Sequence, residues 1–272
     1  VTLTAKWTAH TFTIVVEGNN GTVGSEGEFN GATSATISNV AYDSTTTTLP
    51  AFERKGWSFV NFTDTNSNTY TATTLTSAQI IALYAIAGEN GTVTLTANWT
   101  VDTFDIVVAG NGGKFNGETS YKFEKVAYTA TNITLPKFTR NGYEFVSFTN
   151  GTFSKTHSVE LSASDIDTLY DIAIKNEEAG GERSVTLTAQ WDIHNEYSLR
   201  VSVDPTGSGA AEITTGGTIA GDKQSATGIA YNSDITVVAI ANAGYHFVGW
   251  YNEADEVSTN ATYNFKMPAL AN

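Results

Sequence analysis

Internal repetition is the feature that most constrains the fold of this chain. The string VTLTAKW at residues 1–7 returns as VTLTANW at 93–99 and as VTLTAQW at 185–191, 92 residues later each time. The sequence between these strings also repeats, because AYDSTTTTLP at 41–50 matches AYTATNITLP at 127–136, 86 residues later. Repeated sequence units fold into repeated structural units, so we expect a tandem array of small, similar domains.

A third and more distant copy follows the first two. YSLRVSV at 197–203 takes the place of the opening strand, and AGYHFVGWY at 243–251 takes the place of GYEFVSFT at 142–149. The predicted domains are the last strand of a preceding repeat, two full repeats and a divergent all-β repeat, with bounds 1–10, 11–102, 103–194 and 195–272. We therefore expect the chain to be a segment of a longer array.

Each full repeat is predicted to contain several strands and one helix. VTLTANW at 93–99 alternates apolar and polar side chains, the period of a strand with one buried face. TSAQIIALYAIA at 76–87 has apolar residues at helical spacing, and Thr76 with Gln79 forms a capping box, as Ser162 with Asp165 does in the second repeat. One helix on a small, mostly antiparallel sheet makes the predicted fold class α+β and mainly β.

Charge and composition exclude several classes of function. The 272 residues include 28 acidic and 14 basic side chains, for a net charge of −14, and no cysteine. A polyanion such as nucleic acid needs clustered Lys and Arg, so we expect no nucleic-acid partner. No apolar run reaches the 18 residues that indicate a membrane-spanning helix, so no membrane insertion is expected in this segment.

One set of aromatic residues recurs at equivalent positions of the repeats, on the predicted strand that follows the glycine. We predict that these side chains fill the cores of the repeats, because aromatic residues on strands of small β domains mostly pack inside. A sugar-stacking platform is the alternative. The tryptophans that end the VTLTA strands are expected to pack at the end of a repeat. Contact of these tryptophans with the neighbouring repeat, which would stiffen the joint, is left open. The predicted core residues are Trp57, Phe59, Tyr143, Phe145, Tyr245, Phe247, Trp99 and Trp191.

These aromatic segments resemble a known repeat family. The pattern LPxF followed by Arg, Gly and an aromatic strand is similar to the Listeria-Bacteroides repeat of the internalin B-repeat type, and the final repeat resembles the divergent bacterial B-repeat. The resemblance implies β-grasp-like modules in tandem on exported bacterial proteins, often adhesins or anchored enzymes. The residues that carry it are Leu49, Pro50, Arg54, Gly56, Trp57, Phe59, Val60 and Phe62 in the first copy, Leu135, Pro136, Arg140, Gly142, Tyr143, Phe145, Val146 and Phe148 in the second, and Asn242, Gly244, Tyr245, Phe247, Gly249 and Trp250 in the third.

Catalytic and metal motifs are not recognisable in the sequence. His10, His157, His194 and His246 are scattered, and no HExxH or GxSxG occurs, so we expect neither an enzyme nor a cofactor. GNGGKFNG at 110–117 is interpreted as a turn rather than a phosphate-binding loop, since Asn-Gly pairs adopt the positive φ that hairpins require.

Two stabilising devices remain open alternatives. Glu26 and Glu28 in the acidic loop 18–28 offer calcium ligands, but the spacing of a dedicated calcium loop is missing. Lys6, Asn98 and Gln190 occupy one position in three copies, and this variation argues against an isopeptide crosslink there.

The function expected from these observations is that of a non-catalytic spacer. The repeats would form a monomeric stalk of a bacterial cell-surface or secreted protein, cell-wall attached and adhesin-like, that holds a functional domain away from the cell. The alternative is a binding module in which the helix or the loop at 18–40 contacts a host protein or a glycan.

Overall fold

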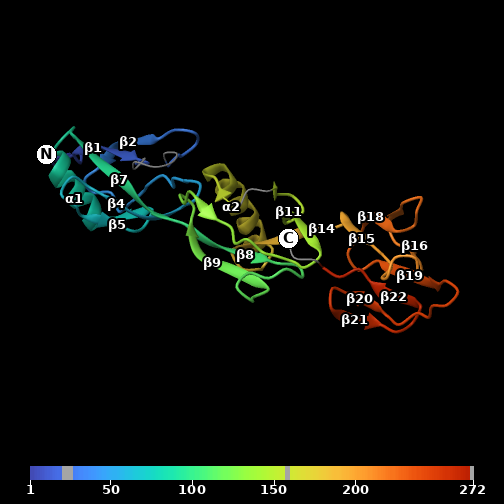
Figure 1. Cartoon of the computed structure of the whole chain (residues 1–272). Coiled ribbons are helices and arrows are strands. Elements are labelled where there is room, and N and C mark those ends of the chain that lie inside the picture. Colours follow the sequence, from blue (N-terminus) through green and yellow to red (C-terminus); the bar gives the residue numbers. More distant parts are fainter. Residues whose placement is uncertain (20–26, 157–159, 270–272) are drawn as a thin grey trace. The chain divides into compact units, whose positions relative to one another are not determined.

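The structure is a computed structural model that describes residues 1–19, 27–156 and 160–269. Strands dominate, and the described residues contain two helices (Figure 1). The chain divides into two compact units, Val1–Ile106 with 123–133 and 161–185, and 107–122 with 134–160 and 186–272. The repeat boundaries expected at residues 10, 102 and 194 stay a prediction.

The first repeat contains a five-stranded sheet and one helix. The strand order is β2-β1-β7-β4-β5, in which β7 pairs in parallel with β1 and antiparallel with β4. Helix α1 contacts β1, β3, β6 and β7 and places Ile80 and Leu83 in the core. The elements are β1 (Thr11–Glu17), β2 (Ser34–Ala41), β3 (Thr46–Thr48), β4 (Trp57–Thr63), β5 (Thr69–Tyr70), β6 (Thr74–Thr76), α1 (Ser77–Ala87) and β7 (Thr92–Val101).

The second repeat has the same strand arrangement. Its sheet has the order β12-β11-β14-β8-β9, and α2 buries Ile166, Leu169, Tyr170 and Ala173. The elements are β8 (Thr103–Ala109), β9 (Ser120–Ala127), β10 (Ile133–Thr134), β11 (Tyr143–Thr149), β12 (Ser154–Thr156), β13 (Glu160–Leu161), α2 (Ala163–Glu178) and β14 (Ser184–Ile193).

Both helices begin where the capping pattern predicts. The Thr76 hydroxyl accepts from the Gln79 backbone N–H, and the Gln79 side chain accepts from the Thr76 backbone. Ser162 and Asp165 repeat this capping box at α2. These reciprocal bonds satisfy N–H groups that have no partner inside a helix, which confirms the predicted helix starts.

The described part of the final repeat, residues 195–269, is built from strands without a helix. Two three-stranded sheets have the orders β15-β18-β17 and β16-β19-β22, and β20 pairs with β21. The strands are β15 (Tyr197–Arg200), β16 (Gly209–Thr215), β17 (Thr218–Ile219), β18 (Ser225–Ile229), β19 (Asp234–Ala241), β20 (Trp250–Asn252), β21 (Asp255–Ser258) and β22 (Thr262–Lys266).

A β-bulge changes the simple alternation expected of the aromatic strand. The register of β4 against β7 shifts between Phe59 and Asn61, and that of β11 against β14 shifts between Phe145 and Ser147. An extra residue moves later side chains to the other face of a strand. Phe59 and Phe62 therefore lie in contact, with ring centroids 4.7 Å apart, although they are three residues apart in sequence.

A buried carboxylate closes the hairpin that follows β4. Asp64 is 6% exposed and accepts hydrogen bonds from the backbone N–H groups of Asn66 and Asn68, at 2.9 and 3.0 Å, and from the Tyr70 hydroxyl at 2.8 Å. Burial by itself raises the pKa of Asp64, but the hydrogen bonds from Asn68 and Tyr70 outweigh it and hold the pKa below its usual value.

We expect Asp64→Ala to lower the stability of the first repeat by about 1–3 kcal/mol, because it leaves buried donors without an acceptor. Asp64→Asn should cost less, since Asn150 fills the equivalent place of the second repeat and accepts from Thr152 and Phe153. A lowered pKa stabilises the fold above the pKa of the unfolded state, and that contribution is lost as the pH falls through the folded pKa. Chemical denaturation between neutral pH and pH 3 measures this effect, and equal pH dependence in wild type and Asp64→Asn would contradict the assignment.

Candidate functional site: the junctions between repeats

Asp102 and His194, the last residues of the two predicted full repeats, are each hydrogen-bonded on both sides. Asp102 N–H donates to the Gly56 carbonyl at 2.9 Å, and the Asp102 carbonyl accepts from Tyr128 N–H at 2.9 Å. At the second junction, His194 N–H donates to the Gly142 carbonyl and the His194 carbonyl accepts from Tyr231 N–H, at 2.9 and 2.8 Å. The backbone of each linker residue therefore joins a glycine turn of one repeat to the tyrosine turn of the next.

The glycine in each turn lies directly beneath the tyrosine ring of the following repeat. A Cβ on Gly56 would lie 2.1 Å from the Tyr128 ring, and a Cβ on Gly142 would lie 2.2 Å from the Tyr231 ring. Both glycines also have positive φ, 74° and 77°, which side chains disfavour. Glycine is required at these positions by both the backbone conformation and the contact.

Helix α2 adds ion pairs and hydrogen bonds to the first junction. Lys55, beside the glycine turn, lies 2.7 Å from an Asp167 oxygen and 2.9 Å from an Asp171 oxygen. The Tyr128 hydroxyl donates to Asp167 at 2.7 Å. Burial and this bond to Asp167 raise the pKa of Tyr128 to about 12, and the Lys55 and Tyr128 hydrogen bonds lower the pKa of Asp167. The ion pairs are about half exposed, so their individual contributions are small.

The Asp102 carboxylate is also held by both repeats. Ser58 of the first repeat donates to one oxygen at 2.5 Å, and Tyr170 of α2 donates to the other at 2.6 Å. Arg183 lies 3.7 Å from the same carboxylate and forms a closer pair with Glu177 at 2.7 Å. The side chain and the backbone of Asp102 thus both connect the first repeat to the second.

The second junction keeps the geometry with different side chains. His194 Nδ1 lies 2.9 Å from Glu144 Oε1, at the positions that Asp102 and Ser58 occupy in the first junction. The His194 ring also packs on Tyr197, with ring centroids 4.4 Å apart, and Tyr143 meets Tyr231 edge to face at 5.7 Å. Aromatic contacts here replace the contacts that α2 makes in the first junction.

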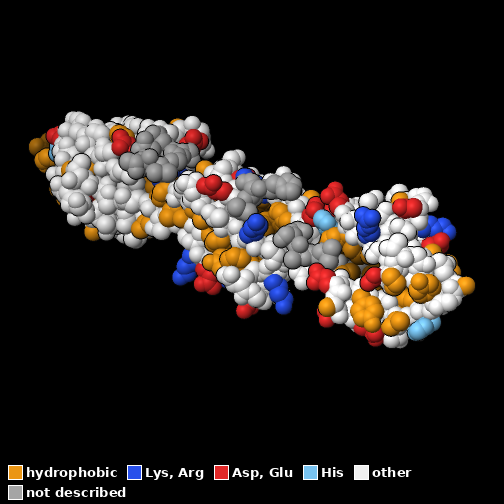
Figure 2. Space-filling view, viewed as in Figure 1, with side chains coloured by type: hydrophobic (Ala, Val, Ile, Leu, Met, Phe, Trp, Pro, Cys, Tyr) orange, Lys and Arg blue, Asp and Glu red, His pale blue; other side chains and the backbone are white. Residues whose placement is uncertain are grey.

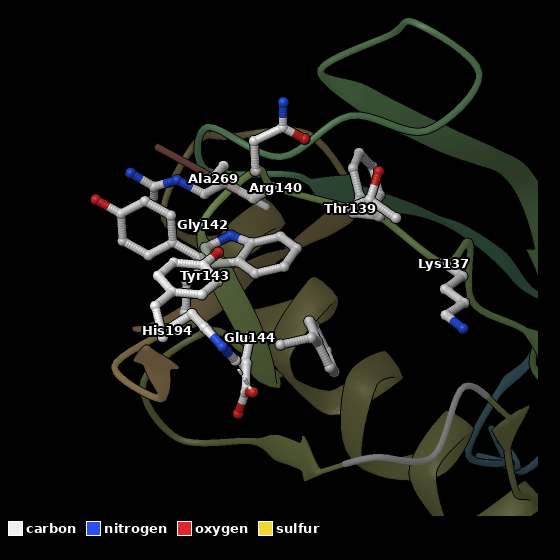
Figure 3. A pocket seen from close by; sticks show the side chains of 13 residues that line it. Lys137, Thr139, Arg140, Gly142, Tyr143, Glu144, His194 and Ala269 are labelled. Atoms are coloured by element: carbon white, nitrogen blue, oxygen red, sulfur yellow. Dashed lines mark hydrogen bonds and ion pairs between the residues drawn. The ribbon is translucent and has the colours of Figure 1, made fainter. Parts of the chain in front are cut away.

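A cavity of about 550 Å³ opens beside the second junction (Figure 3). The Arg140 guanidinium lies over the Tyr143 ring, 3.7 Å from its centroid, and donates to the Asn111 carbonyl at 3.3 Å. The imidazole in the lining, that of His194, is paired with Glu144. Cationic and aromatic walls of this kind suit a polar ligand that stacks on rings, such as a sugar.

Seven of the eight predicted core aromatics are half-buried, and the eighth, Tyr245, is exposed. Phe59 and Trp99 are half-buried and pack against the core of the first repeat, with ring centroids 5.7 Å apart. Phe145 and Trp191 form the same pair at 5.6 Å. The other half-buried members of the set are Trp57, Tyr143 and Phe247.

Tyr245 is a correction to the predicted core, because it is 52% exposed. In the first two repeats the strand after the glycine pairs with a VTLTA strand, as β4 pairs with β7. Residues 245–249 form no strand in the described structure, so no neighbouring strand covers the Tyr245 ring.

The tryptophans at the ends of β7 and β14 pack inside their own repeats. The Trp99 and Trp191 indole N–H groups donate to the Gly18 and Gly110 carbonyls at 2.8 Å. A Cβ on Gly27 or Gly113 would lie 2.5 or 2.4 Å from these rings. Tyr128 and Tyr231, rather than these tryptophans, lie against the glycine turn of the preceding repeat.

The residues considered for metal binding and catalysis are not gathered into one cluster among the described residues. No group of three or more potential metal ligands occurs in the part of the chain that the structure describes. Glu26 and His157 lie outside the described residues, and the Glu28 backbone pairs with that of Glu53. The segment 110–117 is a turn as predicted, with positive φ at Asn111, Gly112, Asn116 and Gly117. Within the described residues, 1–19, 27–156 and 160–269, neither helix is long and apolar enough to cross a bilayer.

The sequence analysis missed Tyr128 and Tyr231 as junction residues. Their signal is the dipeptide Ala-Tyr, which recurs at 41–42, 127–128 and 230–231. A repeated tyrosine next to a predicted strand resembles one more core residue, and its contact with another repeat appears only in three dimensions.

Comparisons with known proteins agree with the interpretation of this chain as a repeat protein. Residues 209–272 match the family described as the divergent InlB B-repeat domain. The chain is 25% identical over 258 residues to a protein of Evansella cellulosilytica named "Putative membrane protein". That alignment covers 94% of this chain and 31% of the relative, so the chain spans about a third of that protein's length.

Gly56→Val should open the first junction, because a side chain there collides with Tyr128 and occupies a disfavoured φ at a cost of about 1–3 kcal/mol. Amide hydrogen exchange of Asp102 and Tyr128 is the measurement: both should be protected in wild type and should exchange much faster in the variant. Gly31→Val is the matched control, since Gly31 has φ 76° with nothing within 4 Å of a Cβ. Unprotected Asp102 and Tyr128 amides in wild type would show that the junction is not formed in solution.

Proposed function

We propose that this chain is a non-catalytic spacer segment of a bacterial surface protein, built from β-grasp-like repeats that are fixed to one another. The observation that carries the proposal is the junction, which recurs with the same two backbone hydrogen bonds and the same glycine beneath a tyrosine ring. A flexible linker needs no such contacts. A spacer that keeps a fixed length requires each repeat to be fixed in orientation to the next.

The surface chemistry agrees with a role outside the cell. Most of the face in Figure 2 is white, the colour of uncharged polar side chains and of the backbone, and the charged side chains are scattered over it. Only 15% of residues are charged, and there is no cysteine to be oxidised. The Evansella relative named as a membrane protein is consistent with surface attachment through parts of the longer protein, and the adhesin-like, cell-wall or secreted context is part of this proposal.

A second candidate function is the binding of a glycan or a host protein. The cavity beside Arg140, Tyr143 and His194 favours it, because stacked aromatic and guanidinium groups recognise sugar rings and polar loops. The spacer is preferred, since Arg140 and Tyr143 are already engaged with each other and with the junction.

Spin labels on both sides of the first junction test the spacer. With cysteines introduced at Asn66 and Glu178, which are both exposed, wild type should give a narrow distance distribution that Gly56→Val broadens and Gly31→Val leaves narrow. The absence of natural cysteines keeps the labelling specific. A broad distribution in wild type would overturn a spacer that holds its repeats fixed.

Glycan-array and host-cell binding by the same chain test the alternative. We expect no binding above background. Saturable binding that Arg140→Ala and Tyr143→Ala abolish, while Tyr121→Ala leaves it intact, would favour the binding module instead.

A further inference from the structure

The first and last strands of the first repeat lie side by side and run in the same direction. The chain enters this repeat through β1 and leaves it through β7, and the two strands form a parallel ladder. At the start of the ladder, Thr13 lies opposite Thr92. At its other end, Glu17 lies opposite Thr96, and β7 continues beyond it to Val101. The points of entry and exit therefore lie at opposite ends of the ladder.

A pull along the chain loads this ladder in shear. Tension draws the start of β1 and the end of β7 apart, so the force runs along the two strands in opposite directions. The hydrogen bonds of a parallel ladder are evenly spaced, and in shear they share the load. If both loaded points lay at the same end of the ladder, the bonds would break one after another. The parallel arrangement therefore resists a pull along the chain more strongly than a pull that opens the ladder from one end.

Neither loaded strand lies at an edge of the sheet. In the order β2-β1-β7-β4-β5, β1 also pairs with β2 and β7 also pairs with β4. Helix α1 contacts both loaded strands. Drawing out either strand lengthwise requires breaking two ladders and exposing core side chains to water. The core side chains on the paired parts of the two strands are Ile14, Val16, Val93 and Leu95.

Two backbone hydrogen bonds fasten the start of β1 to the turn before β7. The Asn90 N–H donates to the Thr11 carbonyl at 2.9 Å. The Thr13 N–H donates to the Gly91 carbonyl, also at 2.9 Å. A Cβ on Gly91 would lie 1.8 Å from the Ala87 carbonyl oxygen, so glycine is required for the turn to pass this close to the end of α1. The turn therefore holds β1 at the point where tension enters the repeat.

Trp99 fastens the other end of the ladder. Its indole N–H donates at 2.8 Å to the carbonyl of Gly18, the residue that follows β1. A shearing pull moves Gly18 back and Trp99 forward, so this hydrogen bond opposes the same motion as the ladder. In the second repeat, Trp191 donates to the Gly110 carbonyl at 2.8 Å. The bond between the tryptophan of the VTLTA strand and a glycine after the opening strand is thus present in both full repeats.

We propose that the first repeat is a load-bearing unit, in which the β1–β7 ladder and the bond from Trp99 to Gly18 resist tension along the chain. The proposal rests on the proposed function, because a segment between a surface and a functional domain is pulled through its two ends. It adds a role to that function, since the chain then transmits force as well as holding distance.

Single-molecule force spectroscopy of the full chain tests the direction of resistance. Handles on cysteines introduced at Thr8 and Thr100 stretch the first repeat along the ladder. Handles at Thr8 and Glu89 open the ladder from one end, because Glu89 lies 2.7 Å from His10. Thr8, Glu89 and Thr100 are exposed, and no natural cysteine competes for attachment.

The two geometries release similar lengths of chain, about 300 Å, because an extended chain spans about 3.5 Å per residue. We expect the unfolding force along the ladder to be several-fold higher than the force that opens it from one end, since forced unfolding reports the barrier to unfolding in the direction of the pull. Equal unfolding forces in the two geometries would overturn the proposal.

Trp99→Phe tests the tryptophan bond, because it keeps an aromatic ring and removes the donor. It should lower the unfolding force along the ladder and leave the force from the opposite end, at Thr8 and Glu89, unchanged. Trp57→Phe is the matched control, since the Trp57 indole N–H has no hydrogen-bond partner among the described residues. Equal loss of force in the two variants would contradict the role of the bond. If Trp99→Phe does not fold, the comparison of the two geometries in wild type still decides the proposal.

The outcome also separates the load-bearing role from the fixed spacer. Equal forces in the two geometries, with a narrow spin-label distribution across the first junction, would remove the load-bearing role and keep the spacer. A broad distribution, with a higher force along the ladder, would remove the fixed junction and keep the load-bearing repeat.

Discussion

The contact between a glycine turn and the tyrosine ring of the next repeat is the constraint on which the organisation of this chain depends. The absence of a side chain at Gly56 and Gly142 lets the rings of Tyr128 and Tyr231 lie against backbone. Each linker residue then donates to the glycine carbonyl and accepts from the tyrosine amide. These hydrogen bonds are made by backbone groups. The linker residue can therefore be Asp102 at the first junction and His194 at the second.

Within a repeat, tryptophan rings also pack against glycines. Trp99 and Trp191 reach glycine carbonyls and lie against glycine Cα atoms, and the bulge in β4 and β11 brings two phenylalanines to one face. These features are identical in two repeats whose connecting loops differ in length. The loops change while the aromatic packing is retained, because close packing leaves little room for substitution.

The two junctions differ in what surrounds the shared backbone contacts. In the first, α2 supplies Asp167, Asp171 and Tyr170. The final repeat has no helix in its described part, and its junction relies on His194, Tyr197 and Tyr231. Helix α2 therefore adds polar contacts to the first junction, whereas the backbone hydrogen bonds of the second junction form without a helix in the described part of the final repeat.

The sequence by itself determined the repeats, the two helix starts at Thr76 and Ser162, and the turn at 110–117, because each depends on residues that are close together in the chain. It also indicated the aromatic strand, but its alternation pattern missed the bulge, which depends on pairing with a distant strand. The tertiary structure alone decided that Trp99 and Trp191 face their own repeats, that Tyr245 is exposed, and that Tyr128 and Tyr231 contact another repeat. Whether an aromatic ring packs within its repeat or against another depends on which glycine leaves space for it. The glycine and the ring are far apart in the sequence, so only the folded chain shows that they are in contact.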